Sequence, residues 1–297
     1  MRMQMSKIKM STTILTIASA VAMSSASVMA DTGKGNVPAG NVGINWKIDK
    51  FLGQHPGNGL LTDLTFMFKV NDETLHQKGT YFAQQFYFDN PGTEGNTAYT
   101  GLQPQPDKDG KQYLRAVFSS FIAKTKSTDK NCSDGADGGA GVSCGVVFPA
   151  TYGHTYKIHI TKTDAHTWSG DVEDEQTSQR VHIGSWSLAD HIGNIKPSGI
   201  GFAEYYAYYE SGYPQFVVPE CSRLAKISVL YGPVSTTNYG GGAGSVSGAY
   251  EYNSKECKGV ASGYSVKTVD AMVTFPGDKK IAVKGQEVQR GFVSVKP

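Results

Sequence analysis

The sequence lacks an excess of charge of either sign. Its 297 residues carry 28 basic and 26 acidic side chains. Three of the basic residues, Arg2, Lys7 and Lys9, lie in the first thirty residues, which contain no acid, so the rest of the chain has 25 basic and 26 acidic residues and a net charge of −1. Nucleic-acid-binding proteins present a basic surface to the phosphates. We therefore expect no nucleic-acid partner.

Long apolar segments are also missing. The apolar stretch Ile14–Met23 has about ten residues, whereas a helix needs roughly 20 to span a bilayer. It follows the basic residues and precedes Val28 and Ala30, the small side chains that signal peptidase requires. We predict that residues 1–30 are a signal peptide. The mature protein should be secreted or periplasmic, with no membrane span.

Cysteine is scarce, and no CxxC or HxxxH spacing is present, which disfavours a zinc site. The four cysteines are Cys132, Cys144, Cys221 and Cys257. An even number in an exported protein predicts disulfides, and four cysteines allow three connectivities. We expect the nearest-neighbour pairing, Cys132 with Cys144 and Cys221 with Cys257.

Helical periodicity is nearly absent, and short runs of β-branched and aromatic residues alternate with turn residues. The chain has 35 Gly, 16 Tyr and 13 Phe. This pattern predicts an all-β sandwich or barrel. The expected strands are Leu64–Val70, Thr80–Phe88, Ala98–Gln103, Tyr113–Ile122, Thr155–Thr161, Thr167–Val172, Arg180–Trp186, Gly199–Tyr206, Gln215–Val218, Leu224–Tyr231, Tyr264–Phe275 and Lys280–Val295.

A change in composition divides the mature chain. Residues 31–233 form the expected main domain, and Ser235–Gly248 is rich in Gly and Ser, which predicts a flexible linker. We interpret residues 234–297 as this linker followed by a small β extension. Sixty residues are few for an independent core. A Cys221–Cys257 bridge would tie the extension to the main domain.

Three stretches resemble a known family. They are Gly79-Thr-Tyr-Phe-Ala-Gln-Gln-Phe with Tyr99-Thr-Gly-Leu-Gln103, then Arg115-Ala-Val-Phe-Ser-Ser-Phe121 with Tyr152-Gly-His-Thr-Tyr156, then Ile200-Gly-Phe-Ala-Glu-Tyr-Tyr206. In this order they resemble the secreted bacterial domain-of-unknown-function family thirty-four seventy-two, over residues 36–233. The resemblance implies an exported, lectin-like β-sandwich of the jelly-roll or concanavalin type. It implies no established activity.

A cluster of aromatic residues is the first candidate site. Tyrosine recurs within nine residues, and two tryptophans lie on the predicted hairpin that precedes it. The candidates are Tyr205, Tyr208, Tyr209, Tyr213, Trp168 and Trp186. Flat rings stack on the apolar faces of sugars, and tyrosine adds a polar group. Rings at alternating strand positions are, however, often core residues.

Glu204 is the second candidate, because its predicted strand is otherwise apolar. It is exposed, paired with Arg115, or catalytic, and we expect the pair. A glycosidase would need a second acid roughly 5–10 Å away. The acidic run that could supply it, residues 171–175, has the composition of a solvated loop.

The loop around the first cysteine pair is a possible calcium site. Asp129, Asp134 and Asp137 lie among several glycines, and oxygen-rich loops can bind Ca²⁺. The spacing does not match the calcium loop of helix-loop-helix proteins. A disulfide-closed surface loop explains the same composition.

The chain has no G-x-S-x-G motif and no phosphate-binding loop. His154, His159 and His166 lie within thirteen residues, and His159 is expected on a solvated strand face. Our leading interpretation is a non-catalytic exported protein that binds a glycan or another surface polymer, without a cofactor. The alternatives are a polysaccharide lyase or glycoside hydrolase, and an envelope or matrix protein with a protein partner.

Overall fold

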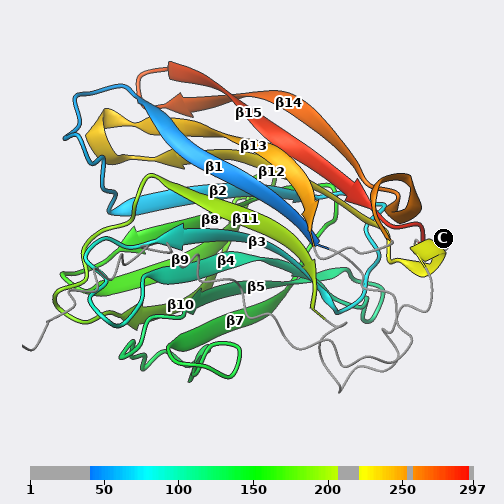
Figure 1. Ribbon diagram of the computed structural model, residues 1–297, viewed down its shortest axis with the longest axis horizontal. Helices are drawn as coiled ribbons and strands as arrows, with labels where there is room; N and C mark the ends of the chain where they lie inside the picture. The colour runs from blue at the N-terminus through cyan, green and yellow to red at the C-terminus, as the bar shows by residue number, and fades with distance from the viewer. Residues whose placement is uncertain (1–40, 207–220, 253–256, 294–297) are drawn as a thin grey trace, which may run out of the picture. The chain divides into compact units, whose positions relative to one another are not determined.

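The computed structural model describes residues 41–206, 221–252 and 257–293, all within one compact unit, residues 35–297. Almost all of its secondary structure is antiparallel strand (Figure 1). In the described residues no helix is long and apolar enough to cross a membrane. The predicted all-β fold is confirmed. The predicted signal peptide and the predicted strand over residues 215–218 lie outside the described residues.

In the described ranges of the chain, fifteen strands make up one hydrogen-bonded sheet. They are β1 Asn41–Phe51, β2 Asp63–Val70, β3 Thr80–Tyr87, β4 Thr97–Pro104, β5 Tyr113–Ser120, β6 Cys132–Asp134, β7 Val142–Pro149, β8 Thr155–Lys162, β9 Thr167–Asp174, β10 Gln179–Ser187, β11 Ser198–Tyr205, β12 Ile227–Thr236, β13 Gly242–Tyr252, β14 Ser265–Phe275 and β15 Lys279–Arg290.

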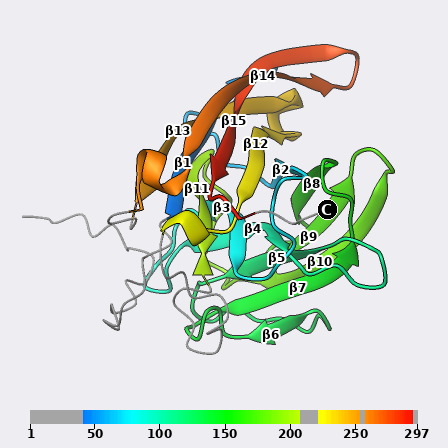
Figure 2. The same cartoon turned by 90° about the vertical axis from the view of Figure 1, so that its right-hand side faces the viewer.

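The sheet bends back on itself to form a sandwich. Its strand order is β10-β9-β8-β2-β12-β13-β1-β11-β3-β4-β5-β7-β6, and the hairpin β14–β15 joins it through β12. The terminal strand β10 contacts β5 and β7, so the two arms of the sheet enclose one core (Figures 1 and 2). The arm β11-β3-β4-β5-β7 therefore has one face toward the core and one face outward.

Alternating side chains decide which face of each strand is buried. In β8, Tyr156, Ile158 and Ile160 are buried, as the sequence pattern predicts. In β5, Phe118 points into the core and stacks on Trp186 of β10, with ring centroids 4.6 Å apart. Such ring pairs join the two arms of the sheet and contribute beyond their buried area.

The Gly- and Ser-rich segment is not a flexible linker, and this prediction is corrected. Residues 242–252 form β13, which pairs with both β1 and β12. The glycines permit a close approach between strands, because a Cβ atom on Gly244 would lie 1.7 Å from the carbonyl oxygen of Lys47. The high glycine content of this segment thus reflects close packing between strands rather than a flexible linker. The strands β1 and β7 were also missed.

Both predicted disulfides are present. Cys132 of β6 is bonded to Cys144 of the adjacent β7, and Cys221 is bonded to Cys257, 36 residues further along the chain. No free cysteine remains among the described residues. The second bridge joins the segment before β12 to the segment between β13 and β14. Together with the β12–β15 pairing, it attaches the C-terminal strands to the rest of the sheet.

Two glutamines in β3 behave differently. Gln85 donates from Nε2 to the hydroxyl of Tyr87. Gln84 is fully buried on the core side, and neither its Nε2 nor its Oε1 has a hydrogen-bond partner among the described residues. The sequence predicts that both amides find partners, and for Gln84 this is wrong. An unpaired buried amide costs roughly 1–3 kcal/mol.

Gly170 in β9 provides a test of the contact between the two arms. A Cβ atom there would lie 2.8 Å from two ring carbons of Phe118. Gly170→Ala should lower the free energy of unfolding by about 1–3 kcal/mol, the usual cost of overpacking. Gly57→Ala is the matched control, because nothing lies within 4 Å of its Cβ position. Equal denaturant midpoints for the two variants would contradict this packing.

Candidate functional site

The structure buries the aromatic residues that the sequence suggests as a binding surface. Trp168 and Trp186 are each 1% exposed, and Tyr205 is 5% exposed. The two tryptophans pack around Phe88, at centroid distances of 5.1 and 6.0 Å. These rings belong to the core, and their prediction as ligand-binding residues is corrected. Tyr208, Tyr209 and Tyr213 lie outside the described residues.

The predicted calcium loop does not gather its carboxylates. Asp129 accepts hydrogen bonds from the backbone N–H of Asn131 and from His182. Asp134 and Asp137 are exposed. Among the described residues, no three His, Cys, Asp or Glu side chains are arranged to hold a metal ion. Asp129 is expected from the sequence to be a calcium ligand, and in the structure its carboxylate instead forms hydrogen bonds within the protein.

The carboxylates of the acidic run at the end of β9 form ion pairs with basic side chains of β8 and its flanking turn. Glu173 lies 3.1 Å from His159, and Asp174 lies 2.9 Å from His154. Glu175 pairs with Lys157. These carboxylates lie on the β8–β10 arm of the sheet, away from β11 in the strand order. They do not supply Glu204 with the second acid of a glycosidase.

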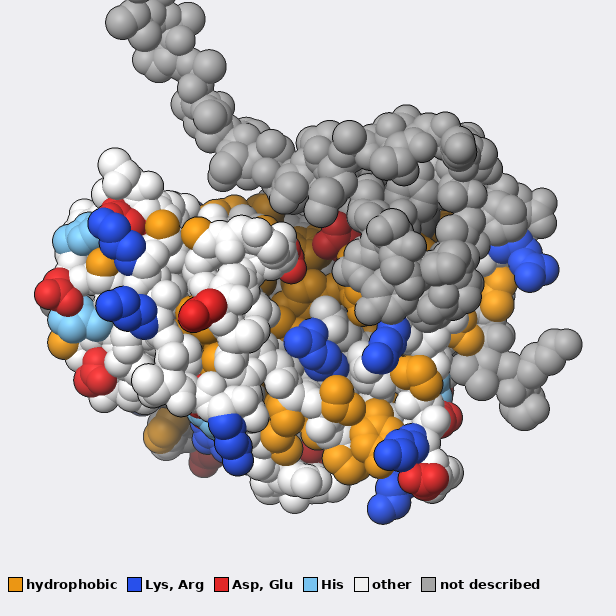
Figure 3. All heavy atoms as spheres, turned by 90° about the horizontal axis from the view of Figure 1, so that it is seen from below, with side chains coloured by type: hydrophobic (Ala, Val, Ile, Leu, Met, Phe, Trp, Pro, Cys, Tyr) orange, Lys and Arg blue, Asp and Glu red, His pale blue; other side chains and the backbone are white. Residues whose placement is uncertain are grey.

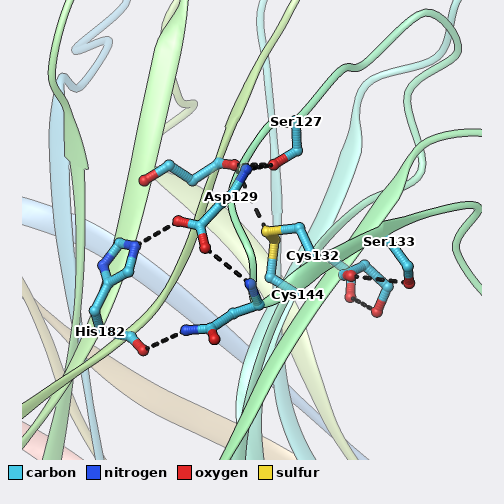
Figure 4. The surroundings of a disulfide bond; sticks show 10 residues. Ser127, Asp129, Cys132, Ser133, Cys144 and His182 are labelled. Carbon is cyan, nitrogen blue, oxygen red and sulfur yellow. Dashed lines mark hydrogen bonds and ion pairs between the residues drawn. A yellow bond between two sulfur atoms is a disulfide. The ribbon is translucent and has the colours of Figure 1, made fainter.

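His182 of β10 lies between two aspartates. Its Nε2 is 2.7 Å from Asp129, and its Nδ1 is 3.0 Å from Asp171. Figure 4 shows the first contact beside the Cys132–Cys144 disulfide. Partial burial lowers the pKa of His182, but the hydrogen bonds to Asp129 and Asp171 outweigh it, so the pKa is raised above its ordinary value. This cluster stabilises the protonated imidazole.

The pH dependence of this cluster can be measured. A histidine with a raised pKa stabilises the folded state below its unfolded pKa, and this contribution is lost as the pH rises through the folded pKa. His182→Gln should therefore lower the melting temperature more at pH 5.5 than at pH 9. His166→Gln, at a half-buried site 3.7 Å from the exposed Asp190, is the control and should have little effect. An equal loss at both pH values for His182→Gln would contradict this role.

A second polar group lies on the outward face of the other arm. Glu204 of β11 is directly opposite Tyr81 of β3, and Gln103 of β4 is directly opposite Arg115 of β5. The β3–β4 register pairs Phe82 with Leu102, which places Tyr81 next to Gln103. Directly opposite residues in antiparallel strands have Cβ atoms about 4.5–5.5 Å apart. Glu204, Tyr81, Gln103 and Arg115 therefore form one row across four strands, called the polar row below.

Glu204 is half-buried and carries no hydrogen bond or ion pair to another described residue. Burial, together with the negative charge of Asp137, raises the pKa of its carboxyl to about 7. A shift of this size corresponds to about 3 kcal/mol against the charged form. Glu204 is thus poised to exchange a proton near neutral pH.

Tyr81 occupies the position next to Glu204. The side chain is 8% exposed, and its hydroxyl has no hydrogen-bond partner among the described residues. Burial raises its pKa well above the ordinary value, and the charge of Asp137 acts in the same direction. The phenol therefore stays protonated and keeps an unused hydrogen-bond donor beside the carboxyl of Glu204.

Arg115 does not pair with Glu204, and that prediction is wrong. The strands β3 and β4 lie between them, and three strand spacings correspond to about 14 Å. Nη1 of Arg115 instead donates to Oε1 of Gln103, at 2.9 Å. The guanidinium lies over Gly145 of β7, where a Cβ atom would be 2.5 Å from Nη2. Gln103 is thereby held with its amide nitrogen free to donate.

Apolar and aromatic side chains border the polar row. Phe202, Ala83 and Val117 are buried on the same outward face, in a cluster of their own. Phe202 packs edge-on against Tyr81 and Tyr99, at centroid distances of 5.8 and 5.3 Å. The strands β5 and β7 lie at the bottom of Figure 1, so Figure 3 views this end of the sheet from below. It shows hydrophobic side chains in a hollow with acidic side chains at its edge.

Two other depressions are less suited to chemistry. One, of about 500 Å³, is lined by residues 187–191 with Lys124 and Lys126. The other, of about 800 Å³, is lined partly by residues 71–73 and Glu287. The polar groups there are largely exposed or engaged with one another, as in the Asn71–Glu287 hydrogen bond. The polar row combines burial, an unpaired acid and unused donors.

Sequence reasoning singled out Glu204 and Arg115 but missed Tyr81 and Gln103. Both missed residues lie in the stretches that carry the family resemblance. Gln103 is polar in a strand of small and apolar residues, the same signal that identified Glu204. Tyr81 gives no such signal, because a strand tyrosine is ordinary.

No family model matches the chain, and no curated protein matches it. Among solved structures, one similar chain is SCP-B, a member of the eqolisin family of peptidases, in a complex with the tripeptide Ala-Ile-His. The identity is 13% and the TM-score 0.40, over 86% of this chain and 98% of that one. Another is scytalido-glutamic peptidase with a peptide-based transition-state analogue, at 12% identity and TM-score 0.41, with the same coverage.

The prediction of a non-catalytic protein that recognises a glycan is corrected by the placement of its candidate binding residues. In the protein itself, three of the rings on which that prediction depended are core residues. What lies outward instead is a carboxyl with a raised pKa beside unused hydrogen-bond donors.

Proposed function

We propose that the protein is a hydrolase that cleaves an amide bond in an extended peptide, with Glu204 as its general base. The observation that carries this proposal is the half-buried carboxyl of Glu204, whose pKa is raised to about 7 and which has no partner among the described residues. A general base works best when its pKa is near the operating pH. The two disulfides support activity outside the cytoplasm.

In the proposed reaction, ionised Glu204 takes a proton from a water molecule, and the water oxygen attacks the carbonyl carbon. The carbonyl oxygen becomes an oxyanion and accepts the hydrogen bond that Tyr81 leaves unused. Protonated Glu204 then gives its proton to the leaving nitrogen as the carbon–nitrogen bond breaks. The carboxyl returns to its ionised state, so the proton is balanced over the cycle.

The neighbours of Glu204 favour acyl transfer over glycoside cleavage. Along the polar row they are Tyr81 and Gln103, which are donors rather than acids. A glycosidase needs two carboxyl groups flanking the bond. Within the described residues, the other carboxyl whose charge acts on Glu204 is that of Asp137, at an exposed loop position. The aromatic border, Phe202 and Tyr99, suits apolar side chains of a peptide.

Glu204→Gln tests the proposed reaction. With unfolded casein as substrate and new amino termini as the readout, the variant should lose at least about 100-fold in kcat/KM, because general-base catalysis contributes at least that much. The wild-type rate should rise with pH through about 7, as Glu204 ionises. Glu173→Gln, in the His159 ion pair of β9, is the matched control and should keep the rate.

Casein cleavage that is unchanged in Glu204→Gln would refute the role of Glu204. The absence of any cleavage by the wild-type protein between pH 3 and pH 9 would refute the peptidase assignment itself.

A further inference from the structure

Among the described residues, the polar row contains hydrogen-bond donors that its own acceptors do not satisfy. Nη1 of Arg115 donates to Oε1 of Gln103, and the hydroxyl of Tyr81 has no hydrogen-bond partner within the described part of the chain. Arg115 forms no ion pair with a described carboxylate. The hydrogen-bond partner of this half-buried guanidinium is neutral, so the guanidinium can still pair with an anion.

From this imbalance we infer a carboxylate-binding subsite, formed by Arg115 and Gln103, that selects peptides with a carboxylate on one side of the cleaved bond. This inference rests on the proposed peptidase function and names its substrate class. A planar guanidinium matches a carboxylate better than a point charge does. The amide nitrogen of Gln103 adds a donor on the side toward Tyr81.

The surroundings hold the guanidinium in place for such a ligand. Gly145 leaves room beneath it, since a Cβ atom there would lie 2.8 Å from its Cζ. Gln103 is 9% exposed, which fixes its amide and hence Nη1 of Arg115. The guanidinium of Arg115 is therefore held in place by its neighbours in the sheet. It loses little conformational freedom when it binds a carboxylate.

The spacing along the row sets the length of the substrate. Glu204 and Arg115 are separated by about three strand spacings, or about 14 Å. An extended peptide covers about 3.4 Å per residue. The carboxylate should therefore lie about three to four residues from the cleaved bond.

Asp137 is the charge that opposes this binding. It lies at an exposed position on the loop between β6 and β7, and desolvation of its carboxyl raises its pKa by more than the positive charge of Arg115 lowers it. The two side chains form no ion pair, so Asp137 repels an incoming carboxylate without replacing it. Removing its charge should strengthen binding.

The test measures binding in Glu204→Gln, so that it does not depend on turnover. Three dansyl-labelled peptides are compared by fluorescence anisotropy: tetraalanine with a free carboxyl terminus, tetraalanine amide, and Ala-Ala-Ala-Asp amide. The first and third peptides show whether the subsite binds a carboxyl terminus or an acidic side chain. At least one carboxylate peptide should bind about tenfold more tightly than tetraalanine amide.

Adding Arg115→Gln should abolish that preference, whereas Arg180→Gln, which removes an exposed arginine of β10, should keep it. Adding Asp137→Asn instead should tighten carboxylate binding at least twofold and leave amide binding unchanged, and this arm stands even if Arg115→Gln does not fold. Equal or absent binding of all three peptides would overturn the subsite, as would a preference that survives Arg115→Gln. The proposed catalytic role of Glu204 is refuted separately, by casein cleavage.

Discussion

Cross-strand register is the constraint on which the candidate site depends. Four residues that are distant in the sequence become neighbours because β11, β3, β4 and β5 pair in that order with a fixed alignment. A shift of one residue in any of these pairings would turn a member of the polar row toward the core. The core side prevents such a shift, since it is filled by large rings such as Phe82 and Phe118.

The raised pKa of the site comes from the burial of the Glu204 carboxyl without a partner among the described residues. A carboxyl whose pKa is raised favours the folded state at low pH, and this contribution is lost as the pH rises from its unfolded value through about 7. The protein therefore gives up stability at neutral and alkaline pH by keeping Glu204 unpaired. His182 changes the stability in the same direction, because its stabilising effect on the folded state is also present at low pH and lost as the pH rises. Both features favour the folded state in mildly acidic surroundings.

The sequence predicts much of the fold because alternation and turn residues are local signals. The strand over residues 155–161 and both disulfides follow from such signals and are confirmed. The order of strands in the sheet is not local, so the sequence could not separate Glu204 from Arg115 by two strands or place Tyr81 between them. Ring residues are ambiguous for another reason: Trp168 at an alternating position can face either side, and only the closure of the two arms buries it.

The Gly-rich segment that forms β13 also could not be interpreted from its composition alone. Glycine favours both flexible chains and closely packed strands, and Gly244 belongs to the second case because a neighbouring carbonyl occupies the position of its Cβ atom. Gln84 remains unexplained by any partner in the described residues, beside the site but on the other face of β3.

The pKa of Glu204 tests the account most directly. It can be measured by carbon NMR of the side-chain carboxyl in protein labelled at glutamate, with Glu204→Gln used to assign the signal. We expect a midpoint near pH 7, set by burial and by the charge of Asp137, and a lower midpoint in Asp137→Asn. A midpoint near 4.5, the ordinary value for glutamate, would show a solvated carboxylate and would contradict the proposed site.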